Sequence, residues 1–489
     1  MTYEELLDKL NSLNLAITTM SFDALTIAPR NGAAFRNKAL SILSGEYFAL
    51  LTDPKTYQIL EESQNNENPI IAESAKTQLR QLNKIKNIPS EEYIAFDKLK
   101  YDSQQSWEDA REKGDYDIFK KDLDALILGQ KSAINHRNST LSIYESCLDD
   151  YEEGLRESHV EGFFSTIEQK LVPFIDKVIE AQGPKPAFLN APVTEHEQDL
   201  ISDLIKEHMG YDASFGYMGH AAHPFSSTFS INDSRITTHY YENDFTSNIF
   251  SIIHEIGHSM YNHQVNIDFE GYPIADSMSM SLHESQSRLM ENMIGRSKSF
   301  WTPLYPKLQA IIPHVLKDVD LNAFIKGINY VEKGYIRVEA DELTYPLHIM
   351  VRYNTEKEIF NNNHSAEGLD HFFADQMTQL LGITPENPSD GILQDVHWSD
   401  ASFGYFPTYA LGTAYAAQFM KKMEEDINVN EALLNGQMDI VFKWLRENIH
   451  QFGGMYNTQT MIEKVTNESF NPNYYIDYLI EKYSTLLGI

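Results

Sequence analysis

The sequence predicts a mainly helical protein of two lobes with one short β-hairpin, and three observations support this. Most segments place apolar residues three and four positions apart with charges between them, as in residues 70–88 and 154–181. Residues 223–241 instead alternate, are rich in hydroxyl, aromatic and β-branched side chains, and contain a turn at 232–234. The chain has 489 residues, which exceeds the size at which one core usually stops growing, so two lobes are expected.

Composition and charge exclude several classes of function. Hydrophobic residues make up 42% of the chain, which is ample for a core and excludes wholesale disorder. The formal charge is −32, so the chain would repel phosphate backbones and anionic lipid surfaces. No apolar run reaches the length of about 18 residues that a membrane-spanning helix needs. We therefore expect neither a nucleic-acid partner nor a membrane partner.

The N-terminal segment and the cysteine content indicate a cytoplasmic protein. Residues 1–14 are acidic and amphipathic, and they lack the basic and apolar regions of a secretory signal. Cys147 is the single cysteine, so no intramolecular disulfide can form. Both features favour a reducing compartment.

The sequence HEIGH at 254–258 carries a candidate metal site on a predicted helix. Residues four apart share one helix face, so His254 and His258 can converge on one ion. Zinc favours imidazole nitrogen, and catalytic zinc sites use three protein ligands and leave one position open for water. Glu255, beside the first histidine, can reach that water and take its proton. We expect Asp244 or Thr246 to cap the start of this helix.

A five-residue pattern needs a third ligand to be convincing. The longer pattern HExxHxxGxxH is rejected, because the chain has Tyr261 and Gln264 where glycine and histidine are required. A following helix is predicted over residues 277–292, and it offers Glu284. Its neighbour His283 points about 100° away around that helix, so only one of the two can be a ligand. We choose Glu284, with an exposed surface glutamate as the alternative.

The second half of the chain contains six short motifs in a fixed order. They are HPF (223–225), DSRIT (233–237), HEIGH (254–258), HESQ (283–286), IRVEAD (336–341) and GYFPTY (404–409). In this order they resemble the diagnostic motifs of the carboxypeptidase Taq family of zinc metallocarboxypeptidases, also called the thermostable carboxypeptidase 1 family. Near the N-terminus, residues 22–29 are similar to the family pattern WDxxTxxP, with Phe22 in place of tryptophan.

The resemblance implies a fold and an activity. It implies a mainly helical peptidase of two lobes with a deep substrate groove, which usually forms a homodimer. We place the lobes at residues 1–205, which are largely helical, and 206–489, which carry the metal site and all six motifs. The family binds one zinc ion per subunit, which cobalt can replace, and it removes C-terminal amino acids from peptides with broad specificity.

Peptide hydrolysis at zinc also needs donors for the developing oxyanion. Glu255 would take the proton of the metal-bound water and later pass it to the leaving amine. Tyr405 is our first candidate for an oxyanion donor, followed by Tyr409, which we also place in the substrate groove. His223 is a further donor candidate. The alternative is that these tyrosines form part of the core or the groove wall.

An exopeptidase must also recognise a free carboxylate, and the planar fork of arginine suits this task. Arg337 in IRVEAD is the best candidate, and Arg352 is the next. The structural alternative is that Arg337 pairs with Asp341, four residues later, along one helix. In DSRIT, we expect Asp233 and Arg235 to pair and brace the hairpin. We expect three neighbours of Glu284 to orient it: His283, Ser285 and Gln286.

The leading hypothesis is therefore a zinc carboxypeptidase whose substrate is a peptide with a free C-terminal carboxylate. The runner-up is an oligoendopeptidase with the same metal site. A non-catalytic peptide-binding protein is a third possibility, and the presence of Glu255 beside both histidines and Glu284 speaks against it.

Overall fold

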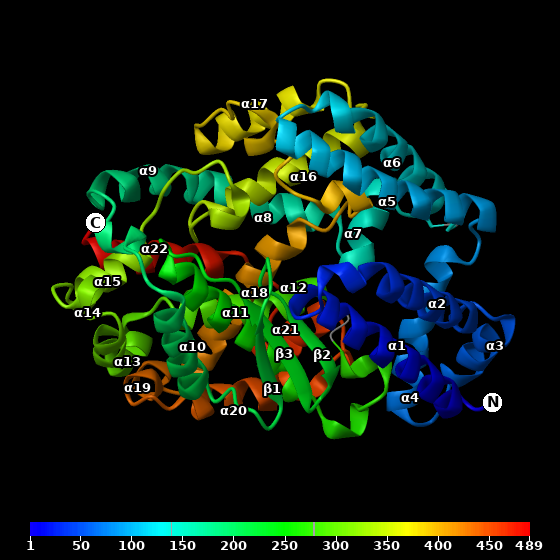
Figure 1. Cartoon of the computed structure of the whole chain (residues 1–489), viewed down its shortest axis with the longest axis horizontal. Helices are drawn as coiled ribbons and strands as arrows, with labels where there is room; N and C mark the ends of the chain where they lie inside the picture. The colour runs from blue at the N-terminus through cyan, green and yellow to red at the C-terminus, as the bar shows by residue number, and fades with distance from the viewer. Residues whose placement is uncertain (138, 277–278) are drawn as a thin grey trace.

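The computed structural model describes residues 1–137, 139–276 and 279–489. The described chain is mainly helical with one small sheet, which confirms the predicted fold class. Figure 1 shows α5, α6, α16 and α17 on one side of the molecule, with the sheet and α1 to α4 on the other. None of the described helices is both long and apolar enough to cross a membrane.

The N-terminal segments form a succession of helices. Their bounds are α1 Tyr3–Thr26, α2 Ala33–Leu51, α3 Pro54–Ser63, α4 Pro69–Ile85, α5 Ser90–Lys113, α6 Asp117–Asn135, α7 Ile143–Tyr151, α8 Glu157–Lys170, α9 Val172–Ala181 and α10 Glu195–Met209. The helix predicted from residues 70–88 is α4, which begins at a proline and is capped by Asn68. The helical stretch 154–181 forms α8 and α9, which are separated at Leu171.

The remaining chain surrounds the candidate site. Its helices are α11 Phe245–His263, α12 Met280–Arg288, α13 Lys298–Ile311, α14 Pro313–Leu316, α15 Leu321–Ile328, α16 Tyr345–Asn361, α17 Leu369–Leu381, α18 Pro407–Asp426, α19 Val429–Leu434, α20 Met438–Asn448, α21 Thr458–Thr466 and α22 Asn473–Leu487. Three short segments also matter for the site: the π-helix η5 Leu289–Ile294 and the 3-10 helices η6 Arg337–Glu339 and η8 His397–Asp400.

The sheet contains the predicted hairpin and one further strand. Strands β2 (Ser226–Ser230) and β3 (Asp233–Thr238) pair antiparallel, as the alternating pattern predicts. Strand β1 (Gly216–His220), which the pattern did not predict, adds to the other side of β3 in parallel and gives the order β1-β3-β2. Arg235 forms two hydrogen bonds to Asp233, at 2.8 and 2.7 Å, so the predicted brace of the hairpin is confirmed.

Helix α11 begins directly after the sheet and packs against it. Asp244 caps the helix by accepting a hydrogen bond from the backbone of Ser247 at 3.1 Å, which confirms one of the two predicted caps. Ser259 on α11 donates to the inward-facing Ser234 of β3 at 2.8 Å. The helix therefore holds the metal motif at a fixed distance from the hairpin.

Two glycines allow the helices of the site to approach one another closely. A Cβ atom at Gly257 of α11 would lie 2.7 Å from the Cα of Ser287 on α12. A Cβ atom at Gly412 of α18 would lie 2.9 Å from the Cβ of Glu284 on α12. Real contacts are never this short, so only glycine permits the three helices to pack at these distances.

The hydrophobic core spans most of the chain. Its largest cluster draws on buried residues from Trp107 to Tyr483, and a smaller cluster joins α1, α3 and α4. Cys147 is free and buried within the large cluster. The division into lobes at residues 205 and 206 stays a prediction.

Candidate metal centre

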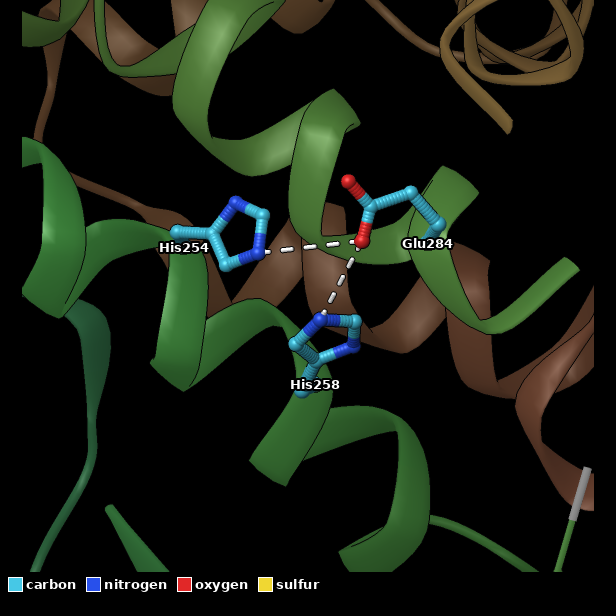
Figure 2. A group of neighbouring side chains, drawn as sticks. All are labelled: His254, His258 and Glu284. Atoms are coloured by element: carbon cyan, nitrogen blue, oxygen red, sulfur yellow. Dashed lines mark ion pairs between the residues drawn. The ribbon is translucent and has the colours of Figure 1, made fainter. Parts of the chain in front are cut away.

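Three side chains from two helices converge on one point. His254 and His258 extend from α11, and Glu284 extends from α12 (Figure 2). Oε2 of Glu284 lies 3.8 Å from Nε2 of His254 and 3.5 Å from Nε2 of His258. Among the described residues, this is the one group of three or more His, Cys, Asp or Glu side chains arranged to hold a metal ion.

The donor set and its spacing fit a tetrahedral divalent ion. Tetrahedral ligands about 2.0–2.1 Å from a zinc ion lie about 3.3 Å from one another, slightly closer than the nitrogens and the oxygen here. Two imidazoles and one carboxylate leave a fourth position open. The side chain of Glu284 is 10% exposed, so the ligands are shielded from solvent but not sealed off.

The first histidine is oriented by a glutamate from the π-helix η5. Nδ1 of His254 lies 2.9 Å from Oε2 of Glu291, which leaves Nε2 free for an ion. Glu291 also accepts from Arg288 at 3.1 Å and from Arg296 at 3.4 Å. Burial opposes ionisation of Glu291, but Arg288 and His254 outweigh it and lower its pKa to about 2. The carboxylate of Glu291 is therefore ionised and accepts a hydrogen bond from the His254 ring.

The second histidine is oriented by another histidine. Nδ1 of His258 lies 2.6 Å from Nδ1 of His283, and Nε2 of His283 lies 3.1 Å from Oδ1 of Asn262. Asn262 in turn donates to Thr228 of β2 at 2.6 Å. When Nε2 of His258 binds an ion, its Nδ1 carries the proton and donates to His283. This chain of contacts connects the metal motif to the hairpin.

The carboxylate ligand is oriented by the residues that follow it on α12. Arg288 donates from Nε to Oε1 of Glu284 at 2.7 Å, and Ser287 donates to Oε2 at 3.3 Å. Although burial opposes it, Arg288 holds the pKa of Glu284 well below its usual range.

The prediction that His283, Ser285 and Gln286 orient Glu284 is wrong. They occupy other positions around the helix, where His283 contacts His258, Ser285 donates to the carbonyl of Leu282, and Gln286 contacts His450.

Glu255 lies between the metal centre and the hairpin. It is 7% exposed, and Ser226, at the start of β2, forms a hydrogen bond to its carboxyl group. Burial raises the pKa of Glu255 to about 7. A carboxyl group with such a pKa can both accept and release a proton near neutral pH.

Of the two candidate tyrosines, Tyr409 lies on α18 and Tyr405 lies in the segment before it. The rings of Tyr405 and Tyr409 lie 5.1 Å apart, and the charge of Glu284 acts on both hydroxyls. The hydroxyl of Tyr409 lies 3.2 Å from Nε2 of His397. Burial raises the pKa of Tyr405 to about 12, so its hydroxyl stays protonated and able to donate.

His223 lies in the connection between β1 and β2 and is exposed. Within the described part of the chain, the structure gives its ring no hydrogen bond or ion pair. The same connection leads to Ser226, the partner of Glu255. His223 is therefore close to the site along the chain but makes no direct contact with it among the described residues.

One of our alternatives was that Arg337 pairs with Asp341. The structure shows that it does not. Its segment is the short 3-10 helix η6, so Asp341 does not lie one helical turn further on. Asp341 instead accepts from the backbone of Leu343 and Thr344. Arg337 donates from Nε to Asp395 at 2.8 Å and from Nη1 to the hydroxyl of Tyr345 at 3.0 Å. No residue in the described ranges accepts a hydrogen bond from its Nη2.

Arg352 on α16 holds the other oxygen of the same aspartate. Its Nε lies 2.7 Å from Oδ2 of Asp395, and its Nη1 donates to the carbonyl of His348 at 2.8 Å. The side chain of Arg352 is 0% exposed, so it has no access to a substrate in this structure. Burial opposes ionisation of Asp395, but Arg352 and Arg337 hold its pKa well below its usual range. We name Arg337, Arg352 and Asp395 the arginine cluster.

One side chain connects the arginine cluster with the metal centre. The ring of Tyr345 lies 4.6 Å from the guanidinium carbon of Arg288, which binds the metal ligand Glu284. The hydroxyl of the same tyrosine binds Arg337. The guanidinium carbon of Arg337 lies 5.0 Å from the ring centre of Tyr409. The two groups of charges are therefore neighbours in one site.

Several residues of this site were missed by sequence reasoning. They are Ser226, Asn262, Arg288, Glu291, Tyr345, Asp395 and His397. Arg288 and Glu291 carried a signal, because they follow Glu284 by four and seven residues and so share its helix face. Asp395 offered no local signal, since its partner Arg337 is 58 residues away.

Comparison with known proteins gives one consistent result. The family model described as Carboxypeptidase Taq (M32) metallopeptidase matches residues 2–483. The chain is 36% identical to Carboxypeptidase 1 of Bacillus subtilis over 99% of both chains. A solved Pyrococcus furiosus carboxypeptidase is similar with a TM-score of 0.94 at 31% identity, over 99% of both chains. An M32 carboxypeptidase of Deinococcus radiodurans is similar with a TM-score of 0.95 at 27% identity, also over 99% of both chains.

Proposed function

The chain belongs to the carboxypeptidase Taq (M32) family of metallopeptidases, and from this premise we propose that it is a zinc-dependent carboxypeptidase of broad specificity. Metallocarboxypeptidase activity and peptide substrates follow from the family. The choice of zinc, the role of Glu255 and the means of recognising the substrate are our proposals, and each is supported by a different part of the site.

His254, His258 and Glu284 would hold the metal. The donor set of two nitrogens and one oxygen suits zinc, and cobalt can occupy the same geometry. When bound there, the ion would polarise the peptide carbonyl and lower the pKa of the attacking water. Glu291 and His283 orient the two rings, and Arg288 orients the carboxylate.

Glu255 would move the proton. Glu255 follows His254 directly on α11, the charges of His254 and Glu284 act on its buried carboxyl group, and a pKa of about 7 suits a general base at neutral pH. It would accept a proton from the attacking water and then release that proton to the leaving amine. Ser226, at the start of β2, is a neighbour of the Glu255 carboxyl group and lowers its pKa.

Tyr405 would donate to the oxygen that gains charge in the transition state. Its hydroxyl is neutral at neutral pH, and the charge of Glu284 acts on it. Tyr409, which is held by His397, would line the groove next to it and contact the substrate. His223 is exposed in the HPF motif, so it would act as a further donor only to a substrate that lies over the hairpin.

The observation that carries the choice of a carboxypeptidase is the charge of the arginine cluster. Two guanidinium groups share one carboxylate, so the cluster keeps one positive charge in a buried setting beside the metal centre. An unbalanced buried charge is costly, and a substrate carboxylate would balance it. Nη2 of Arg337 would bind that carboxylate, while Arg352, which is fully buried, would hold Asp395 rather than contact the substrate.

The same site could also serve an oligoendopeptidase, and one assay separates the two. An N-blocked dipeptide with a free C-terminal carboxylate is compared with its C-terminal amide, using one preparation whose zinc content has been measured. A carboxypeptidase cleaves the free form and leaves the amide nearly intact. Equal cleavage of both would assign the site to an endopeptidase, and zinc-loaded protein that cleaves neither would be a binding protein.

We also propose three further features for this chain, the first from the family resemblance and the other two from the sequence. They are assembly as a homodimer, a cytoplasmic location and the division into two lobes at residue 205. The mass of the protein in solution, measured by light scattering or sedimentation, tests whether it is a homodimer.

A further inference from the structure

Helix α16 carries a row of buried polar side chains toward the site. His348, Arg352 and Glu356 follow one another at intervals of four residues, so they share one face of the helix. All three are 0% exposed. Arg352 holds Asp395 of the arginine cluster, but the function proposed above gives Glu356 no role.

Glu356 is a buried carboxyl group surrounded by neutral donors. Its Oε1 accepts from Nε1 of Trp398 at 2.8 Å. Its Oε2 accepts from the hydroxyl of Tyr144 at 2.9 Å and from the backbone N–H of Gly404 at 2.9 Å. No ion pair joins it to a cation within the described ranges. Burying a carboxyl group without a cation is costly, and here three hydrogen bonds offset that cost in place of an ion pair.

Two of these donors lie at the two ends of one turn. Trp398 lies in η8, three residues after Asp395, and Gly404 directly precedes Tyr405. Because Glu356 accepts from both ends, it fixes the turn as a unit against α16. The same helix therefore holds the arginine cluster through Arg352 and the segment that leads to the tyrosines through Glu356.

Gly404 shows how closely this turn packs against α7. Its φ angle is +88°, and a Cβ atom there would lie 2.5 Å from the backbone of Cys147 on α7. Only glycine allows the backbone to lie this close to α7, where its N–H reaches Glu356. A shift of the turn would therefore displace Tyr405, the next residue, from its contacts with Tyr151, His397 and Tyr409 and change its distance from Glu284.

We propose that Glu356 is a positioning residue for peptide hydrolysis, which holds the Trp398–Gly404 turn so that Tyr405 faces the reacting carbonyl. Glu356 does not touch the substrate, and its effect passes through Tyr405. The inference rests on the proposed function for the role of that tyrosine. Arg337, which we propose binds the substrate carboxylate, has no contact with Glu356 and is held by Asp395 and Tyr345.

The first test is Glu356→Gln in the full-length, zinc-loaded enzyme. The amide keeps the size of the side chain but replaces one acceptor oxygen with a donor, so one side of the turn loses its hydrogen bond. We expect kcat for the free-carboxylate dipeptide to fall about 10- to 100-fold, because small displacements of catalytic groups have effects of this size. KM and zinc content should stay as in the wild type.

Two further variants serve as control and support. Glu358→Gln changes a carboxylate two residues away on the same helix, which contacts Asn362 and is partly exposed, and it should leave kcat unchanged. Tyr144→Phe removes one donor and leaves the carboxyl group in place, so it should fold even where Glu356→Gln does not. It should lower kcat in the same direction by a smaller factor.

The decisive measurement is a double-mutant cycle with Tyr405→Phe. If Glu356 acts through the tyrosine, Glu356→Gln causes little further loss of kcat in the Tyr405→Phe background. If the losses of kcat in the two single variants multiply in the double variant, the inference is overturned. It is also overturned if Glu356→Gln and Tyr144→Phe both fold and keep wild-type kcat. Either result leaves the proposed function intact. A Tyr405→Phe enzyme with full kcat overturns both the inference and the proposed role of Tyr405.

Discussion

Two neighbouring groups of charged side chains form the site, and they differ in the sign of the charge that would balance each group. The metal centre has three carboxyl groups, those of Glu255, Glu284 and Glu291, and two guanidinium groups, those of Arg288 and Arg296, which bind Glu284 and Glu291. In the arginine cluster, Arg337 and Arg352 face one carboxylate, that of Asp395. A cation would balance the charge of the first group, and an anion would balance the charge of the second.

The difference indicates how one site can bind two unlike partners. A divalent cation would complete the metal centre, and the carboxylate of a peptide C-terminus would complete the arginine cluster. Tyr345 contacts Arg288 on one side and Arg337 on the other, so the two partners would bind next to each other. The predictions below break one group at a time, so that each effect can be assigned to it.

The largest effect is expected from Glu255→Gln in the metal centre. The variant keeps all three metal ligands but loses the proton acceptor, so kcat should fall about 10²- to 10⁴-fold. Zinc content, measured by elemental analysis, should match the wild type. An enzyme that retains full turnover while holding zinc would falsify the assignment of Glu255 as the base.

A smaller effect is expected from Arg337→Ala in the arginine cluster. A hydrogen bond to a charged group contributes about 1.5–3 kcal/mol, so KM for the free-carboxylate dipeptide should rise about 10- to 100-fold. Cleavage of the amide should stay as low as before, and zinc affinity should not change. Arg337→Lys, which keeps the charge without the planar fork, should recover part of the loss. Unchanged KM in Arg337→Ala would assign substrate recognition to another residue.

The smallest effect on turnover at saturating zinc is expected from Glu291→Gln. The variant weakens the hydrogen bond that orients His254, and changes in such outer partners typically lower metal affinity about 10- to 100-fold. Competition with a chelator measures that affinity directly. Arg337→Ala is the matched control, because it changes the neighbouring cluster only. If both variants bind zinc with wild-type affinity, Glu291 does not support the metal centre.

The features that sequence alone predicted are those that neighbouring residues decide. The helix spacing of His254 and His258, the cap at Asp244 and the hairpin braced by Asp233 and Arg235 all depend on contacts within a few residues. Helical and strand periodicity fix which side chains share a face, so these features could be predicted from the pattern. Helix geometry also predicted that only one of Glu284 and His283 can be a ligand, the known zinc set of two histidines and one glutamate favoured Glu284, and the structure places Glu284 beside both histidines.

The features that only the tertiary structure decided depend on contacts between distant segments. Arg337 pairs with Asp395, 58 residues away, rather than with Asp341, because its segment is a short turn and not a helix. His283 contacts His258 on another helix, although we expected it to orient its own neighbour. The sequence determined which chemical groups were present and which of them shared a helix or strand face. Partners across the site depend on how helices pack, and that packing is set by the whole core.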